Sequence, residues 1–314
     1  MHRVSSLFAR ICLLQLRAAS LGAAVFLTGC ADPLEPTKQK DVWLDVGRAP
    51  SAPYPSDTTL PSVAASLMKF GANGHTVTQE PYIEAVPDGI GRTFEALRGL
   101  GGTTYRFEVP LLVGDQVAVW TQRTQQTLQA AVSGGWRVVV VLSSHPDPSL
   151  SVGSATALGY GYASTVIGLI QPYLSVIDAV ELGNEMEVQT PGMFLPTGIP
   201  GTDFSGTDSA HYNAAIVNTA VAYFRGMRQA FLDAGGAVAA IPRLSSATSG
   251  HTWWINESMR NISVTRYGQD GIAWHWYTTG TGGYAYLTSD YSGKGSVIGQ
   301  LRAWYGNNGF RLWV

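Results

Sequence analysis

The feature that most constrains the fold is an alternation of short apolar runs with longer helical stretches, which begins near residue 66. Three of the helical stretches end in a glycine pair, at Gly101-Gly102, Gly134-Gly135 and Gly235-Gly236. Glycine commonly ends helices because it adopts the left-handed conformation without a steric penalty. Strand and helix in regular alternation are typical of a parallel sheet with crossover helices.

The sequence predicts seven strands, with the strongest signal in the four consecutive valines of the third. The strands are expected at 67–70, 103–109, 137–142, 177–182, 237–245, 271–276 and 310–314, and residues 71–75 form the first turn. Helices are expected at 90–100, 117–132, 162–174, 214–234 and 296–305. The Gly-, Pro- and Thr-rich stretch from Thr190 to Ser209 is long enough to predict a functional loop over one face.

This inventory predicts an α/β fold, an incomplete (β/α)₈ barrel that occupies residues 63–314 and ends at the seventh strand. An open doubly wound sheet is the alternative, since the periodicity alone does not exclude it. The first turn has no G-x-G-x-x-G pattern, and the chain has neither a phosphate-binding loop motif nor H-E-x-x-H. We therefore predict that the protein uses no cofactor and no metal.

The first 29 residues have the features of a targeting segment. Arginines up to Arg17 precede an apolar run at 21–27, and the run is followed by Thr28-Gly29-Cys30. This ending resembles a bacterial lipoprotein signal, which implies that Cys30 is acylated and becomes the first mature residue. A plain signal peptide with a chance cysteine is the alternative. If the lipoprotein reading holds, the protein is exported and held at the cell envelope, and Ala31 favours the outer membrane of a Gram-negative host.

Residues 30–62 are predicted to be a linker, because six prolines interrupt any long helix there. The protein would then touch the membrane only through its lipid anchor. The net charge of -2 provides no basic field, so nucleic acid is not an expected partner. Nine Trp and fourteen Tyr suit carbohydrate binding, although the same rings could fill the core. The sequence indicates no oligomeric state.

Polar residues lie at the ends of several predicted strands. In a (β/α)₈ barrel these ends meet at one mouth, where the active site forms. We therefore expect six residues to converge there, namely Arg106, His145, Asn184, Glu185, His275 and Tyr277.

In type and order, these residues resemble glycoside hydrolase clan A, which includes cellulase-like and glucuronidase-like families. The resemblance covers roughly 66–314 and centres on the Asn-Glu pair that ends the run at 180–185. It implies retaining hydrolysis of O-glycosyl bonds in a poly- or oligosaccharide, with Glu185 as general acid/base. It further implies that Asn184, Arg106, His145, His275 and Tyr277 contact the substrate or the nucleophile.

The second carboxylate of such enzymes is a glutamate at the end of the seventh strand, often after a Leu-Trp-hydrophobic run. Residues 311–314 are such a run, so the nucleophile is expected just beyond Val314. We therefore expect the 314-residue chain to be a truncated form that is inactive or nearly so. A carbohydrate-binding surface lipoprotein derived from such an enzyme is the alternative function.

Each of these residues also has a structural interpretation. Glu185 could be a carboxylate at a helix entry, stabilised by the helix dipole, and Glu187 is a competing acid if the strand ends later. Arg106 could be an ordinary ion-pair partner of Glu108 or Glu181. His145 could pack locally in its loop, and His275 and Tyr277 could fill the core. The Trp253-Trp254 pair could be a sugar platform or a hydrophobic staple.

Overall fold

The computed structural model describes residues 71–78, 89–195, 206, 208–248, 251–255, 270–275 and 311–313. All of them belong to one compact unit, Ala64–Val314. The predicted signal peptide, linker and lipidation site Cys30 lie outside the described residues, as do Tyr277 and the predicted helix at 296–305. Within the described ranges, no helix is both long and apolar enough to span a membrane.

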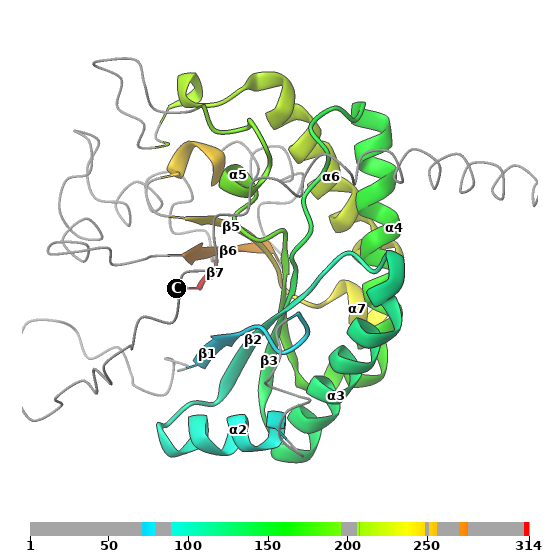
Figure 1. Cartoon of the computed structure of the whole chain (residues 1–314), viewed down its shortest axis with the longest axis vertical. Coiled ribbons are helices and arrows are strands. Elements are labelled where there is room, and N and C mark those ends of the chain that lie inside the picture. The colour runs from blue at the N-terminus through cyan, green and yellow to red at the C-terminus, as the bar shows by residue number, and fades with distance from the viewer. Residues whose placement is uncertain are drawn as a thin grey trace, which may run out of the picture. The chain divides into compact units, whose positions relative to one another are not determined.

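The described strands form one parallel sheet whose spatial order follows the chain order without exception. They are β1 (Gly71–Gly74), β2 (Thr104–Val109), β3 (Arg137–Leu142), β4 (Ile177–Leu182), β5 (Arg243–Thr248), β6 (Asp270–His275) and β7 (Arg311–Trp313). Figure 1 shows the sheet curling as it passes from β1 to β7. A doubly wound sheet would reverse its strand order at a switch point, so the incomplete barrel is confirmed.

Helices follow the strands and pack on the outer face of the sheet (Figure 1). The α-helices are α2 (Gly89–Gly99), α3 (Val117–Gly134), α4 (Val152–Ile170), α5 (Met186–Gln189), α6 (Ala214–Asp233) and α7 (Gly236–Ala239). Short 3₁₀ turns occur at η2 (Gly114–Gln116), η3 (Gln171–Val176) and η4 (Ser209–His211). As predicted, α3 ends at a glycine in the left-handed conformation, with Gly135 at φ 66°.

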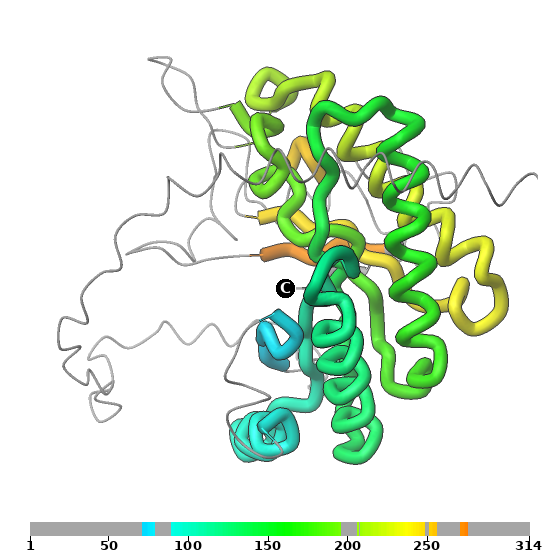
Figure 2. The backbone as a smooth tube through the Cα atoms, turned by 45° about the vertical axis from the view of Figure 1, so that its right-hand side comes forward, coloured from blue at the N-terminus to red at the C-terminus, as the bar shows by residue number. Residues whose placement is uncertain are grey.

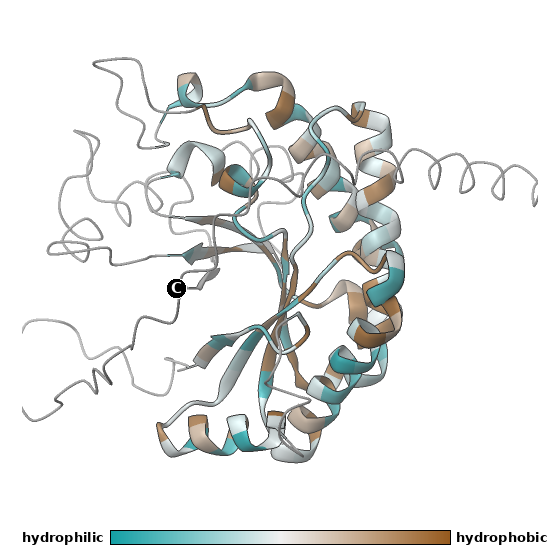
Figure 3. Ribbon diagram, in the orientation of Figure 1, coloured by the Kyte–Doolittle hydropathy of each residue, from teal (hydrophilic) through white to brown (hydrophobic). Residues whose placement is uncertain are grey.

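The strands separate two apolar layers, because successive side chains point to opposite faces. Tyr105, Phe107 and Val109 of β2 face the helices and belong to the large outer core. Val139, Ala179, Leu244 and Ala273 form a separate small cluster, with one residue from each of four adjacent strands β3 to β6. Figure 3 shows apolar colouring along the central strands and in patches on the helices that cover them. Polar side chains on the strand face of the small cluster can therefore meet inside the barrel.

Helices α4 and α6 lie side by side along the outside of the sheet (Figure 2). Two glycines set their spacing. A methyl group added at Gly159 would overlap the carbonyl oxygen of Tyr223, and one added at Gly226 would overlap the carbonyl oxygen of Thr156. The two backbones are thus in direct contact, which is closer than helices with larger interface residues can approach.

Three predicted boundaries were wrong. Strand β1 occupies Gly71–Gly74, which was predicted to be a turn, while the predicted strand at 67–70 lies outside the described residues. Helix α4 begins ten residues before the predicted Tyr162, because the Ser151 hydroxyl caps it by accepting from the Ser154 amide. Strand β5 begins after Pro242, and the residues predicted to open it form the short helix α7. Proline has no amide hydrogen for the sheet, so the strand starts beyond it.

Candidate active site

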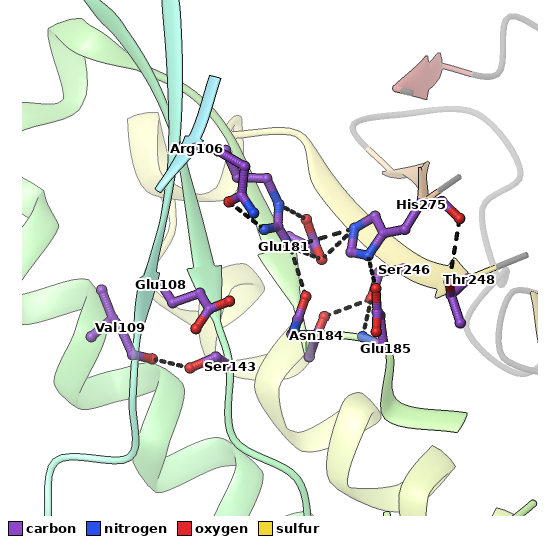
Figure 4. A network of polar contacts seen from close by, with 12 residues as sticks. Arg106, Glu108, Val109, Ser143, Glu181, Asn184, Glu185, Ser246, Thr248 and His275 are labelled. Carbon is purple, nitrogen blue, oxygen red and sulfur yellow. Dashed lines mark hydrogen bonds and ion pairs between the residues drawn. The ribbon is translucent and has the colours of Figure 1, made fainter. Parts of the chain in front are cut away.

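The network at the strand ends is centred on Arg106, which lies on the inner face of β2 (Figure 4). Its Nε donates to Glu181 Oε2 at 2.9 Å, and its Nη2 donates to Glu181 Oε1 at 2.8 Å. The same guanidinium donates to Asn73 Oδ1 of β1 at 2.7 Å and to Asn184 Oδ1 at 2.8 Å. One arginine therefore joins β1, β2 and the end of β4.

Glu181 is the most buried carboxylate of this network, with a side chain only 1% exposed. Burial alone would raise the pKa of Glu181, but the charges of Arg106 and His275 outweigh it and lower the pKa to about 2. The group is therefore a permanent anion at any pH near neutrality. Of the two ion-pair partners predicted for Arg106, Glu181 is the one that it contacts. Glu108 instead lies 3.4 Å from His75 Nδ1.

His275, at the end of β6, lies between two glutamates. Its Nε2 is 3.2 Å from Glu181 Oε1, and its Nδ1 is 2.9 Å from Glu185 Oε1. Burial lowers the pKa of His275, but hydrogen bonds and charge from Glu181 and Glu185 raise it to about 9 overall. An imidazolium donates from both nitrogens, so it can bond to both carboxylates at once.

Glu185 follows β4 in a tight turn. It has φ 46° and ψ 47°, and it is the only non-glycine with positive φ among the described residues. Ser246 of β5 fixes the turn, because its Oγ donates to Gly183 O at 2.8 Å and accepts from the Glu185 amide at 3.0 Å. Such backbone strain persists only where its surroundings hold it, and it is concentrated at functional sites.

The side chain of Glu185 makes no hydrogen bond to the start of α5, a helix of only four residues. It points to His275 instead (Figure 4). The helix-entry interpretation of Glu185 therefore does not describe this carboxylate. Glu187 is completely buried within α5, where one of its oxygens accepts from the Thr248 amide at 2.6 Å. The Glu187 side chain is thus enclosed, whereas the side chain of Glu185 is 13% exposed.

Four of the six predicted site residues are in this network: Arg106, Asn184, Glu185 and His275. His145 follows β3 but is exposed, and its side chain makes no hydrogen bond to the part of the chain that the structure describes. The structure therefore gives no contact between His145 and the network.

The two adjacent tryptophans after β5 differ. Trp254 is 1% exposed and donates from its indole to Ser246 O, so it is a core residue that supports the site from outside. Trp253 is half-buried and stacks on Tyr212, with ring centroids 4.8 Å apart. Tyr212 Oη in turn lies 2.9 Å from His251 Nδ1, and burial lowers the pKa of His251 to about 4. Among the described residues, no cluster of His, Cys, Asp or Glu forms a metal-binding group.

Solved structures of glycoside hydrolases match this fold. A family 5 xyloglucanase from Paenibacillus pabuli aligns with a TM-score of 0.54 and 12% identity, over 78% of this chain and 77% of that one. The chain shares the fold of glycoside hydrolase family 5. A family 5 xyloglucan-specific β-1,4-glucanase from a ruminal metagenomic library aligns with a TM-score of 0.52 and 13% identity, over 77% of this chain and 72% of that one.

A family 5 broad-specificity endoglucanase from Clostridium longisporum gives the same picture, with a TM-score of 0.50 and 11% identity, over 78% of this chain and 75% of that one. At these identities, the likeness to family 5 is one of fold. No protein-family profile matches the sequence, and no curated protein matches it either. The clan A resemblance drawn from the strand-end residues thus agrees with the family 5 fold that the structure has.

Proposed function

We propose that the protein is a retaining glycoside hydrolase in which Glu185 is the general acid/base. The observation that carries this proposal is the contact between His275 and Glu185, the glutamate of the Asn-Glu pair in the turn that follows β4. Support comes from the fold, since barrel enzymes carry their catalytic residues at the carboxyl ends of the strands.

The contacts suit proton transfer. Glu185 and His275 can hold a proton between them, either as carboxylate and imidazolium or as carboxylic acid and neutral imidazole. In the second form, Glu185 protonates the oxygen of the departing sugar. It then accepts a proton from the water that releases the glycosyl intermediate.

Retention requires a second carboxylate about 5–5.5 Å from the acid/base. We propose that it directly follows β7, beyond Val314, close to Arg106 and Glu185. Asn184 accepts from Arg106 through its carbonyl oxygen, so its NH₂ group remains available to donate to a sugar hydroxyl. The substrate is proposed to be a β-linked poly- or oligosaccharide. The matched structures are named as xyloglucan- and glucan-cleaving enzymes, and that polymer class is the first to test.

The test is a comparison of leaving groups in Glu185→Gln, made in protein that carries the residues following Val314. Loss of the proton donor should slow cleavage of an unactivated glycoside by ~10²–10⁴-fold. An aryl glycoside with an acidic leaving group should regain much of the first step, because its departure needs little protonation. Glu95→Gln, which changes an exposed carboxylate on α2, is the matched control.

The product anomer, followed by NMR, decides the stereochemistry. Equal losses on both substrates would show that Glu185 is not the acid, and an inverted product would refute the two-carboxylate geometry. Rapid turnover by the chain ending at Val314 would place the nucleophile on another residue. If the protein that carries the residues following Val314 bound saccharide without hydrolysing it, the alternative function, a carbohydrate-binding surface lipoprotein, would be favoured.

We also propose that Cys30 carries the lipid anchor at the cell envelope. Cells fed a labelled fatty acid should incorporate it into the wild-type chain and not into Cys30→Ser. Equal incorporation into both proteins would refute the assignment.

A further inference from the structure

Glu187 is a buried carboxyl group that the proposed reaction does not use. Its side chain is fully enclosed at the start of α5, two residues after Glu185. Oε1 accepts from the Thr248 amide at 2.6 Å, while Oε2 is buried without a hydrogen-bond partner. Backbone amides alone donate to this carboxyl and one oxygen has no partner, which is a poor environment for a carboxylate and costs a neutral carboxyl far less.

The charges that act on Glu187 do not compensate for this burial. The Thr248 amide, the amide of Glu187 itself and His275 on β6 favour its ionisation, whereas the Glu185 carboxylate on the same turn opposes it. No ion pair reaches Glu187 within the described residues. Burial prevails and raises the pKa of Glu187 to about 8, so the group is mostly protonated at neutral pH.

The bond to Thr248 connects Glu187 to the active-site network. Thr248 is the last residue of β5, and its partner in the sheet register is His275. Its hydroxyl donates to the carbonyl oxygen of His275 at 3.4 Å. The ends of β5 and β6 therefore approach each other at Thr248 (Figure 4). Glu187 accepts from the amide of that same residue.

We infer that Glu187 is a positioning residue of the same site, whose buried carboxyl holds the Thr248 end of β5 beside His275 and so aligns His275 with Glu185. The inference rests on the proposed function, because it assigns Glu187 a task within that site. Above the pKa of Glu187, a second carboxylate would face Glu185 in an enclosed space. Repulsion would then loosen the turn and limit activity on the alkaline side.

The first test is an infrared titration of the 314-residue chain across the pKa of Glu187. The wild type should show a protonated-carboxyl band at neutral pH that disappears around pH 8. The band should be absent from Glu187→Gln and present in Glu185→Gln and Glu95→Gln. The side-chain amide introduced by Glu187→Gln keeps an acceptor for the Thr248 amide, so this variant preserves the shape of the site. A band lost in Glu185→Gln and kept in Glu187→Gln would overturn the inference, and so would the absence of any band in the wild type.

If Glu187→Gln does not fold, the band is still assigned by its survival in Glu185→Gln and its midpoint near pH 8. These measurements need no catalysis, so they can fail while the hydrolase proposal stands. Conversely, the expected titration without any hydrolysis would remove the proposed function, and the positioning role with it, while the protonated state of Glu187 would stand.

The second test concerns the pH profile of kcat/KM in the active, extended protein. The alkaline limb should lie near 8 in the wild type and move towards about 9, the pKa of His275, in Glu187→Gln. A purely structural role would lower kcat without moving the limb. An unchanged limb would therefore overturn the positioning role.

Discussion

His275 Nδ1 lies 2.9 Å from Glu185 Oε1, while the other nitrogen of the same ring faces the permanently ionised Glu181. The imidazole thus links a buried anion to the proposed acid/base. Arg106 fixes the position of the Glu181 carboxylate, and that carboxylate in turn fixes the His275 ring. The orientation of Glu185 is therefore fixed by residues from three strands, β2, β4 and β6.

His275 should make stability depend on pH. Its pKa is raised in the folded protein, so its contribution is fully present below the ordinary value near 6.5 and is lost as the pH rises through about 9. The wild-type Tm should fall across this window, and His275→Asn should show a smaller fall from a lower starting point. His145→Asn, which changes an exposed histidine, is the control. A slope unchanged in His275→Asn would mean that the ring is neutral in the folded state.

Glu181→Gln should destabilise the fold by about 3–5 kcal/mol, because it leaves Arg106 without its buried anion. The pKa of Glu181 is lowered, so its stabilisation is present above about 4.5 and is lost as the pH falls towards about 2. Chemical denaturation at several pH values measures both effects. On the same strand, Asp178→Asn should cost less, since its partner Arg137 is 40% exposed. Equal costs would contradict the central role of Glu181.

Removing the Glu185 side chain should expose the strain in its backbone. A residue with a Cβ in the left-handed region costs ~1–2 kcal/mol, and glycine avoids that cost. Glu185→Gly should therefore unfold at a higher temperature than Glu185→Ala, although both lack the proposed acid. At helical Val188 the order should reverse, with alanine more stable than glycine. The same order at both positions would mean that Glu185 is not strained.

The contact between α4 and α6 should tolerate no added methyl group. Gly226→Ala should lower the free energy of unfolding by ~1–3 kcal/mol, because the new methyl group meets the backbone of α4, which can move only with the whole helix. Gly168→Ala, at an open position on α4, should instead stabilise by up to ~1 kcal/mol. Thermal unfolding of the two variants gives the comparison. Similar Tm values would show that the helices separate easily.

The sequence was most informative where one force dominates. The bounds of β3 and β4 were predicted to the residue, because short runs rich in apolar residues favour buried parallel strands. It was least informative at β1, whose sequence Gly-Ala-Asn-Gly has no strand propensity. There, pairing with β2 imposes the extended conformation.

In the site, the strand-end rule brought Arg106, Asn184, Glu185 and His275 together correctly. Glu181 was considered only as an ion-pair partner, although a signal for its central place was available. It lies two residues after Ala179, so both side chains point to the inner face of β4. The environment of Glu187 had no such signal, since a four-residue helix inside a loop leaves no periodicity to read.

The paired glycines of α4 and α6 restrict how this protein can change over generations. Where two side chains meet, a larger residue on one helix can be offset by a smaller one on the other. At Gly159 and Gly226 an added side chain meets the backbone of the other helix. A backbone cannot be made smaller, so no second substitution compensates for the first. In a randomised library selected for folding, Gly159 and Gly226 should survive nearly unaltered while the exposed glycines on α4 drift freely. In relatives of this protein, Gly159 and Gly226 would then be retained more widely than the proposed catalytic residues, because a relative that only binds saccharide does not need those.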